Sequence, residues 1–338
     1  MQDIRTVVKD LLQPSETLVR DMASLKGDIL ILGVGGKIGP SLALLAKQAI
    51  ERSGVPRKVI GVSRFSEPGL KEQLEKEGIE TRVADLMHEA ELAFLPDVEN
   101  VIYLAGTKFG TRGNEAFTWA MNTYLPGRVA EKYKNSRIVV YSTGNVYPFS
   151  PVVSGGADEK ILPAPIGEYG QSCLGRERIF QHFSEEYQTP LLIFRLNYAN
   201  DLRYGVLVEI AKAVKEERPI DVNMGHVNVI WQGDSNEITL RCLHHCAKPA
   251  KILNVTGPET APVRWLAKQF GEIFGKTPVF TGEEQPSALL SNAAESFRLF
   301  GYPKVSLKQM IQLTAEWLQQ DGATISKPTH FQERKGEY

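Results

Sequence analysis

Three glycines at regular spacing follow the first apolar run of the chain. Gly33, Gly36 and Gly39 come directly after residues 28–32 and open the amphipathic pattern SLALLAKQAIER. A paired phosphate needs a tight turn without Cβ atoms, close approach of the backbone, and a helix N-terminus whose free N–H groups face the anion. This pattern meets all three needs and predicts a dinucleotide-binding turn. The alternative interpretation is a strand-to-helix turn that binds nothing.

The residues after the second apolar run bear on which dinucleotide would bind. Ser63 and Arg64 follow residues 58–62, and no carboxylate is available there to bind two ribose hydroxyls. A hydroxyl beside a guanidinium suits a 2′-phosphate, because arginine can bind it through two hydrogen bonds. We therefore expect NADP(H) to be favoured and NAD(H) to be possible, with a solvated surface arginine as the alternative. Asp85 could approach the adenine or cap a helix.

These candidates depend on apolar runs that alternate with helical patterns through the first 200 residues. Such runs predict parallel strands that are covered on both faces. A late strand is expected near 251–257. We therefore predict an α/β fold, a Rossmann-type doubly wound parallel sheet with a smaller C-terminal α/β lobe. The runs lie at 28–32, 58–62, 100–106, 137–143 and 190–196.

The same patterns divide the chain into three parts. Residues 1–26 are expected to form an N-terminal helical extension, in which Ser15 caps a helix. Residues 27–200 form the Rossmann dinucleotide-binding domain, together with the late strand. Residues 201–338 form mainly the second lobe, and the polar stretch after residue 326 carries no motif.

The composition excludes several classes of partner. The 338 residues include 39 Lys and Arg and 40 Asp and Glu, so the formal charge of -1 gives no general attraction to nucleic acid or anionic lipid. No run approaches the roughly 20 apolar residues of a membrane span. The 42% hydrophobic content is ordinary for globular proteins. We therefore expect a soluble globular protein with no nucleic-acid or membrane partner.

The three cysteines, Cys173, Cys242 and Cys246, are too few for a disulfide framework. They fit a reducing compartment, and we expect the cytoplasm. The pattern CLHHC at 242–246 suggests zinc, but a tetrahedral site needs more ligands and no second Cys/His cluster exists. We expect no metal and a helix that packs small thiols. Cys173 is also a possible covalent nucleophile, although no His partner is evident.

Several short motifs occur together in an order typical of one family. They are the Gly33 turn, Asp85, YLAG at 103–106, YSTGNVY at 141–147 and EYGQSC at 168–173. Their spacing resembles that of the extended short-chain dehydrogenase/reductase family, the NAD-dependent epimerase/dehydratase group, over nearly the whole chain after the N-terminal extension. The resemblance implies a Rossmann domain that holds the coenzyme, a small C-terminal substrate-binding lobe, an active site in the cleft between them, and a homodimer.

The resemblance also implies roles for individual residues. Thr143 falls where the family places a Ser or Thr that hydrogen-bonds the reacting carbonyl or alcohol, and Tyr169 falls on its catalytic tyrosine. Asn122 and Tyr147 match positions at which the family commonly carries Asn and Tyr. The implied cofactor-binding residues are Gly33, Gly36, Lys37, Ile38, Gly39, Ser63, Arg64, Asp85, Leu86, Leu104, Ala105 and Gly106.

The chain departs from the family's Tyr-x-x-x-Lys motif, because Cys173 stands where the lysine is expected. An unperturbed tyrosine has a pKa near 10, so about one in a thousand is ionised at pH 7, whereas a cation within about 4–6 Å lowers that pKa by one to three units. A neutral thiol supplies no positive charge. We expect Tyr169 to be a poor base but a usable proton donor, so carbonyl reduction should be impaired less than alcohol oxidation. Alternatively, Lys108 or Arg112 could replace the lysine.

Substrate contacts are expected where the strands end and the second lobe begins. Each candidate has an alternative interpretation as a solvated or packed side chain. They are Lys108, Asn197, Arg203 and Trp231, with Arg195, Tyr204 and Arg298 as further choices.

Two functions fit these patterns. The first is an NAD(P)-dependent oxidoreductase or epimerase that acts on a hydroxyl or carbonyl of a small sugar-like substrate: a sugar, a nucleotide sugar or a sugar acid. In this function Thr143 orients the substrate oxygen and Tyr169 exchanges its proton. The second is a catalytically weakened or redox-silent NAD(P)-binding protein with a sensing or regulatory role, which Cys173 keeps open.

Overall fold

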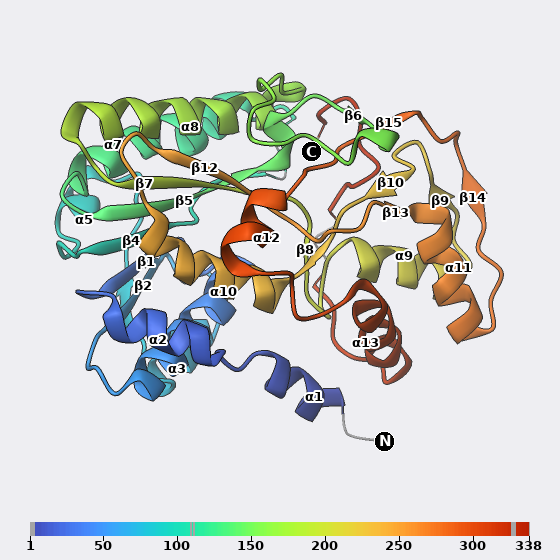
Figure 1. The fold of residues 1–338 in the computed structure, drawn as a ribbon, viewed down its shortest axis with the longest axis horizontal. Helices are drawn as coiled ribbons and strands as arrows, with labels where there is room; N and C mark the ends of the chain where they lie inside the picture. The colour runs from blue at the N-terminus through green and yellow to red at the C-terminus, as the bar shows by residue number, and fades with distance from the viewer. Residues whose placement is uncertain (1–3, 109, 111, 326–328, 338) are drawn as a thin grey trace.

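The computed structural model describes residues 4–108, 110, 112–325 and 329–337. Within them, the main sheet has seven parallel strands in the order β12-β7-β5-β4-β1-β2-β3 (Figure 1). The order reverses between β1 and β4, where doubly wound sheets bind ligands. The predicted Rossmann-like α/β fold is confirmed. The strands are β1 (Ile29–Leu32), β2 (Val59–Ser63), β3 (Glu80–Val83), β4 (Asn100–Tyr103), β5 (Arg137–Thr143), β7 (Leu191–Leu196) and β12 (Lys251–Val255).

Helices cover both faces of this sheet. One layer contains α2 (Glu16–Ser24), α3 (Gly39–Ser53), α4 (Leu70–Lys76) and α10 (Gln232–Cys242), which the 3-10 turn η4 (Leu243–His245) follows. The other contains α5 (Glu89–Ala93), α7 (Leu125–Lys132) and α8 (Gly167–Tyr187), and α6 (Glu115–Trp119) and the π-helical turn η1 (Ala120–Tyr124) lead into α7.

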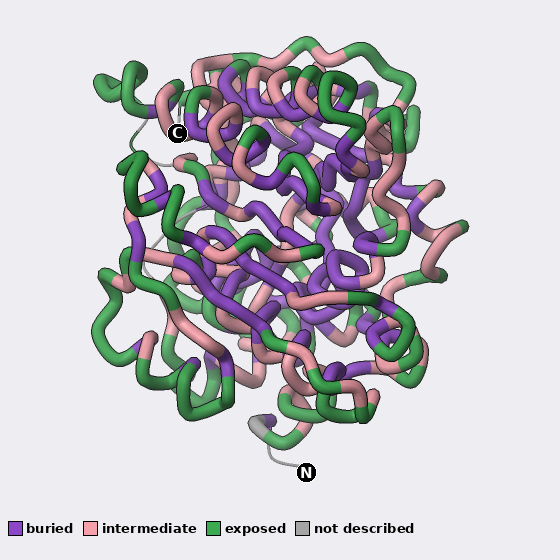
Figure 2. The backbone as a smooth tube through the Cα atoms, turned by 90° about the vertical axis from the view of Figure 1, so that its left-hand side faces the viewer, coloured by how far each residue is buried: buried purple, intermediate pink, exposed green. Residues whose placement is uncertain are grey.

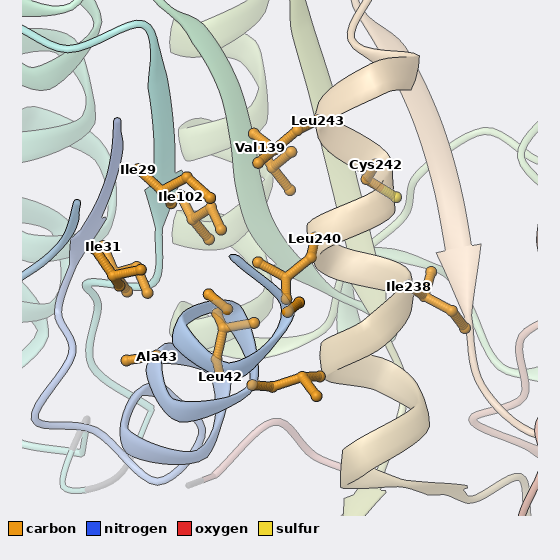
Figure 3. Close-up of a cluster of buried hydrophobic side chains, with 14 of the residues drawn as sticks. Ile29, Ile31, Leu42, Ala43, Ile102, Val139, Ile238, Leu240, Cys242 and Leu243 are labelled. Atoms are coloured by element: carbon orange, nitrogen blue, oxygen red, sulfur yellow. The ribbon is translucent and has the colours of Figure 1, made fainter. Parts of the chain in front are cut away.

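Alternate residues of each strand face opposite layers, because side chains of a strand alternate between the two faces of a sheet. Ile29 of β1 packs in one core with Leu42 of α3 and Leu240 of α10 (Figure 3). Leu30, the next residue of β1, joins the opposite core, which includes Phe180 of α8. The apolar runs are therefore buried on both sides, as their composition predicts.

A separate hydrophobic core lies in the C-terminal half of the chain. It is built from α9 (Val206–Lys215), α11 (Val263–Phe274) and α13 (Leu307–Gln319), with α1 (Ile4–Leu11) packed against α13. Beside it, α12 (Ala294–Phe300) packs on β12. Short pairs of strands connect these elements: β6 (Ser150–Pro151) with β15 (Ser287–Ala288), β8 (Ala199–Asn200) with β11 (Ile230–Trp231), β9 (Ile220–Asp221) with β14 (Phe280–Thr281), and β10 (His226–Val227) with β13 (Ala261–Pro262). Two 3-10 turns, η2 (Gly144–Val146) and η3 (Val152–Ser154), follow β5 and β6.

Segments from both ends of the chain complete the main sheet and its cover. Strand β12 pairs with β7, and α10 packs against α2 and α3, although β12 and α10 both lie beyond residue 200. Helix α2 begins as predicted, because Ser15 accepts a hydrogen bond from the Leu18 amide at 3.0 Å.

Burial follows this arrangement. Figure 2 shows buried backbone through the middle of the molecule and exposed backbone along the outer loops and helices. Among the described helices, none has both the length and the apolar character needed to cross a membrane.

Candidate functional site

The glycine turn joins β1 to α3 and leaves no room for a side chain at Gly33 or Gly39. Gly33 has a φ of +91°, and a Cβ atom there would lie 2.8 Å from the Ala105 backbone nitrogen. A Cβ atom on Gly39 would lie 2.1 Å from the Val34 carbonyl oxygen. Helix α3 has no side-chain cap and no acidic residue in its first turn. Its N-terminal N–H groups therefore suit a phosphate, and the turn fits a dinucleotide.

The end of β2 flanks this turn. A Cβ atom on Gly35 would lie 2.4 Å from the Ser63 hydroxyl oxygen. The Arg64 side chain is 67% exposed, and its Nη1 atom lies 3.8 Å from Oδ2 of Asp85. Asp85 does not cap α5, whose N-cap residue is His88; instead, its Oδ1 atom accepts a hydrogen bond from the amide of Met87 at 3.0 Å. Arg64 and Asp85 thus share the edge beside the turn.

One cavity of about 270 Å³ brings several predicted residues together. Thr143, at the end of β5, and Tyr169, in the first turn of α8, both line it. Thr143 is held by Asn145, whose amide donates to Oγ1 of Thr143 at 3.2 Å and whose Oδ1 atom accepts from it at 2.9 Å. The predicted residues that also line the cavity are Lys37, Ile38, Leu104, Gly106, Lys108, Asn197 and Tyr204.

Other predicted residues lie away from this cavity. Arg203 does not line it, and its Nε atom pairs with Oδ1 of Asp201 at 2.9 Å. Trp231 is 2% exposed and packs in the C-terminal core. Leu86 is likewise buried, in the core beneath α5 and α7. In the described part of the chain, no group of three or more His, Cys, Asp or Glu side chains could hold a metal ion.

Cys173 lies one turn after Tyr169 on α8 and is fully buried. Burial raises the pKa of its thiol. The pKa of Tyr169 is raised well above its usual value, first by burial and then by the neighbouring thiol, while Arg176 and Thr143 oppose the rise. Both groups are therefore neutral near pH 7.

Asn122 lies behind the cavity, in the π-helical turn η1, and is fully buried. Its Nδ2 atom donates to the Thr107 carbonyl oxygen at 2.8 Å and to Oγ of Ser172 at 3.0 Å. Its Oδ1 atom accepts from the Thr107 amide at 2.9 Å and from Nη2 of Arg176 at 2.7 Å. All four hydrogen-bonding positions of the amide are used. Asn122 therefore ties the loop after β4 to α8.

Of the two cations proposed to replace the lysine, Lys108 approaches Tyr169. Its Nζ atom lies 5.6 Å from the centre of the Tyr169 ring and 6.0 Å from that of Tyr198. Burial, and secondly the charge of Lys37, lower the pKa of Lys108 to about 8. Arg112 instead pairs with Glu337, at 3.5 Å.

Comparison with known proteins identifies the family of this chain. A family model described as the NAD dependent epimerase/dehydratase family matches residues 29–199, just over half of the chain. The chain belongs to this family. The matched residues run from β1 to β8 and include the glycine turn, Thr143 and Tyr169. Among curated proteins, no significant match is found.

Solved structures show the same fold. A UDP-glucuronic acid 4-epimerase from Bacillus cereus, in complex with UDP-glucuronic acid and NAD, has a TM-score of 0.72 at 20% identity, over 87% of this chain and 99% of its own. A dTDP-glucose 4,6-dehydratase from Bacillus anthracis, in complex with NAD, has a TM-score of 0.72 at 18% identity, over 87% and 97%. A UDP-glucose 4-epimerase from Thermotoga maritima, with UDP-glucose, has a TM-score of 0.69 at 19% identity, over 87% and 99%.

The sequence assigned no role to Arg176 in this family member, because Arg176 does not take the position of Cys173 on the helix. The residue is 6% exposed, lines the cavity, and donates from Nη1 to the Tyr141 carbonyl oxygen at 2.9 Å. It lies seven residues after Tyr169 and three after Cys173, so all three share one face of α8. This spacing is the signal in the sequence that could have found Arg176. It places a permanent positive charge near Tyr169, whereas the Tyr-x-x-x-Lys motif alone shows only the neutral thiol of Cys173.

Proposed function

We propose that this member of the epimerase/dehydratase family binds NAD(P)(H) and catalyses hydride transfer at a hydroxyl or carbonyl of a sugar, nucleotide sugar or sugar acid. The observation that carries the proposal is the pair of Thr143 and Tyr169, which together line a cavity beside a glycine turn with the geometry of a phosphate site. The solved structures of similar fold, which contain NAD and nucleotide sugars, support it.

Each residue then has a defined task. The free N–H groups at the start of α3 bind the pyrophosphate. Thr143 holds the substrate oxygen, and Tyr169 donates a proton to it or removes one from it. Lys108 contributes positive charge over the Tyr169 ring, which favours the negative charge that develops on the oxygen. When bound, the nicotinamide supplies or accepts the hydride.

We propose that Cys173 takes the place of the family lysine and sets the pH dependence of the reaction. Because burial and the Cys173 thiol raise the pKa of Tyr169, the phenol stays protonated near pH 7, although Arg176 opposes this. A protonated phenol can act at once as the acid in carbonyl reduction. Alcohol oxidation needs the ionised phenol, whose fraction is small at this pH.

We therefore predict different pH profiles for the two directions. Between pH 6 and 7, where Lys108 keeps its charge, alcohol oxidation should rise about tenfold per pH unit, whereas carbonyl reduction should stay nearly constant, because the ionised fraction of a group below its pKa grows tenfold per unit. Cys173→Lys should move the break in both profiles to lower pH, and Cys173→Ala is the matched control. Initial rates measured in both directions test this. Profiles that do not change in Cys173→Lys would remove Cys173 from this role.

We also propose that NADP(H) is preferred over NAD(H), because the exposed Arg64 guanidinium lies beside the turn and only loosely pairs with Asp85. Arg64→Ala should weaken NADPH binding about tenfold or more, since charge-assisted hydrogen bonds are lost, and should leave NADH binding unchanged. Arg82→Ala, on the neighbouring strand β3, is the control. Fluorescence titration with each coenzyme measures the effect, and an equal loss for both coenzymes would contradict the preference.

The experiment that tests the proposed function has two steps. Fluorescence titration first asks whether NADPH or NADH binds, and hydride exchange is then measured across a panel of sugars, sugar acids and nucleotide sugars. Binding with hydride exchange supports an enzyme. Binding without exchange favours the second candidate, a redox-silent sensor, for which the neutral Tyr169 and Cys173 are the supporting observation. No binding of either coenzyme rejects both functions.

We further propose that the protein forms a homodimer through the outer face of η1, α7 and α8. This face carries a groove lined by Tyr124, Gly127, Ile179 and Phe183, and Tyr124 is 60% exposed. Apolar patches of this kind commonly mark protein interfaces. Light scattering of the purified protein measures its molar mass, which should be that of two chains.

A further inference from the structure

Arg176 reaches from α8 to the edge of the sheet where β4 and β5 end. Helix α8 packs against β5 and β7 (Figure 1). The Nη1 atom of Arg176 donates to the Tyr141 carbonyl oxygen of β5 at 2.9 Å, and its Nη2 atom donates to Oδ1 of Asn122 at 2.7 Å. A Cβ atom on Gly106, in the loop after β4, would lie 2.3 Å from Nη2. The guanidinium therefore takes the space that a side chain at Gly106 would need, and it borders the cavity that Tyr169 also lines.

This guanidinium is buried without a carboxylate to balance it. Arg176 is 6% exposed, and among the ion pairs of the described residues none includes it. Glu177 follows it in the chain, but the Glu177 carboxylate pairs with Arg195 at 2.6 Å. The Nε atom of Arg176 is also buried and has no hydrogen-bond partner. Because an unbalanced buried charge and an unpaired donor both cost stability, their retention beside a cavity indicates a function.

The position of Arg176 on α8 directs its charge towards Tyr169. Tyr169, Cys173 and Arg176 follow one another at intervals of four and three residues, so they share one face of the helix. Side chains of a helix lean towards its N-terminus, which brings the guanidinium back towards Cys173 and Tyr169. Burial raises the pKa of the Tyr169 phenol and of the Cys173 thiol, and the charge of Arg176 opposes both rises. The geometry and the charge therefore point to the same target, the tyrosine.

Two other ionisable groups lie close to these side chains. Burial raises the pKa of Tyr103, whose ring centre lies 5.7 Å from the Arg176 guanidinium, so this phenol is neutral. Lys108 lies over the Tyr169 ring, but burial and, secondly, the charge of Lys37 lower the pKa of Lys108 to about 8. Lys108 therefore loses its charge in mildly alkaline solution, whereas a guanidinium keeps its charge throughout.

We propose that Arg176, one turn beyond Cys173 and held by Asn122, supplies to Tyr169 the positive charge that the family lysine would supply from position 173. Arg176 acts through Tyr169 by favouring the ionised phenol, so it is a positioning residue. Asn122 fixes the guanidinium from η1 through the hydrogen bond to Nη2. The inference rests on the proposed function, in which Tyr169 exchanges the proton of the substrate.

Ionisation of the phenol at position 169 is measurable without coenzyme or substrate. Difluorotyrosine replaces Tyr169 in the full chain, because fluorine lets a phenol ionise at lower pH, and fluorine NMR follows its titration. Arg176→Gln should lower the ionisation constant about tenfold or more, since a nearby cation favours the charged form by at least that much. Arg176→Lys keeps the charge and should stay close to the unaltered chain. Arg178→Gln, at an exposed position of the same helix, is the matched control and should change nothing.

Arg176→Met is a second neutral variant, of a length similar to arginine, and urea unfolding shows which neutral variant keeps the fold. An ionisation constant that is unchanged in the folded neutral variant overturns the inference. So does an equal loss in Arg176→Lys, because hydrogen bonding rather than charge would then be at work. A fluorinated phenol that stays protonated until the unaltered chain unfolds also overturns it.

Hydride transfer gives the functional measurement. Between pH 6 and 7, Arg176→Gln saturated with coenzyme should oxidise alcohol about tenfold or more slowly than the unaltered chain, because the rate follows the ionised fraction of the phenol. Cys173→Lys combined with Arg176→Gln should recover most of this loss, since it returns a cation to the family position. An unchanged rate in Arg176→Gln contradicts the inference. If the unaltered chain transfers no hydride, it is the proposed function that fails, and the NMR titration alone decides whether Arg176 acts on the phenol.

Discussion

Replacing Tyr169 with phenylalanine is expected to lower hydride transfer about 10²- to 10⁴-fold, because a positioned proton donor or acceptor contributes that much to a reaction of this type. The substitution keeps the ring that lies under Lys108 and removes only the hydroxyl, in the cavity that Thr143 also lines. Coenzyme affinity should therefore stay within about twofold, since no phosphate-binding group changes. Single-turnover rates and fluorescence titration measure the two quantities separately.

The matched control for this prediction is Tyr187→Phe. Tyr187 is the last residue of α8 and is 37% exposed, so its hydroxyl lies at the far end of the helix from Tyr169. Its loss should leave the rate unchanged. If Tyr169→Phe kept the rate of the unaltered chain, another group would transfer the proton. The role proposed for Thr143 would then have to be tested by substitution in the same way.

The largest expected effect on stability is at Glu177. This carboxylate is fully buried and accepts hydrogen bonds from Nε and Nη2 of Arg195 at 2.9 and 2.6 Å, and from Oγ of Ser142 at 2.5 Å. Arg195 is 1% exposed and also donates to the Tyr147 hydroxyl at 2.7 Å. Glu177→Leu should therefore lower the free energy of unfolding by about 3–5 kcal/mol, because it leaves a buried guanidinium without its counter-charge.

Urea unfolding tests this prediction. Replacing both partners, as in Glu177→Leu with Arg195→Met, should restore much of the lost stability, since no buried charge is left unpaired. Arg218→Ala breaks an exposed pair with Glu216 and should change stability by less than about 1 kcal/mol. If Glu177→Leu destabilised the protein no more than Arg218→Ala, the ion pair would not be what joins β5, β7 and α8.

Local patterns predicted the sheet and the glycine turn. Strands β1, β2, β4, β5 and β7 follow from uninterrupted apolar runs, because a strand that is buried on both faces has no polar face to alternate with. The pattern of Gly33, Gly36 and Gly39 is likewise readable, since the turn itself requires glycine at Gly33 and Gly39. The position of Tyr169 beside Thr143 required the family motif, because the two lie 26 residues apart, with two 3-10 turns and the short strand β6 between them.

The C-terminal segment, residues 329–337, and the contacts of Asn122 could not be predicted from local sequence patterns, because they depend on residues that are far apart in the chain. The C-terminal segment looks like a polar tail, and its place is set by the Arg334 bonds to Ser287 and by the packing of Gly336 on Gly167. Likewise, Asn122 matches a family position in sequence, yet its full set of partners forms only when η1 meets α8.

The late addition of β12 has a consequence for biosynthesis. Because this strand closes the edge of the sheet beside β7, and α10 covers β1 and α3, a growing polypeptide that ends near residue 200 would expose an unpaired strand edge and a bare apolar face. Such species associate readily. We therefore expect this half to complete its fold only after residues up to 255 have emerged from the ribosome.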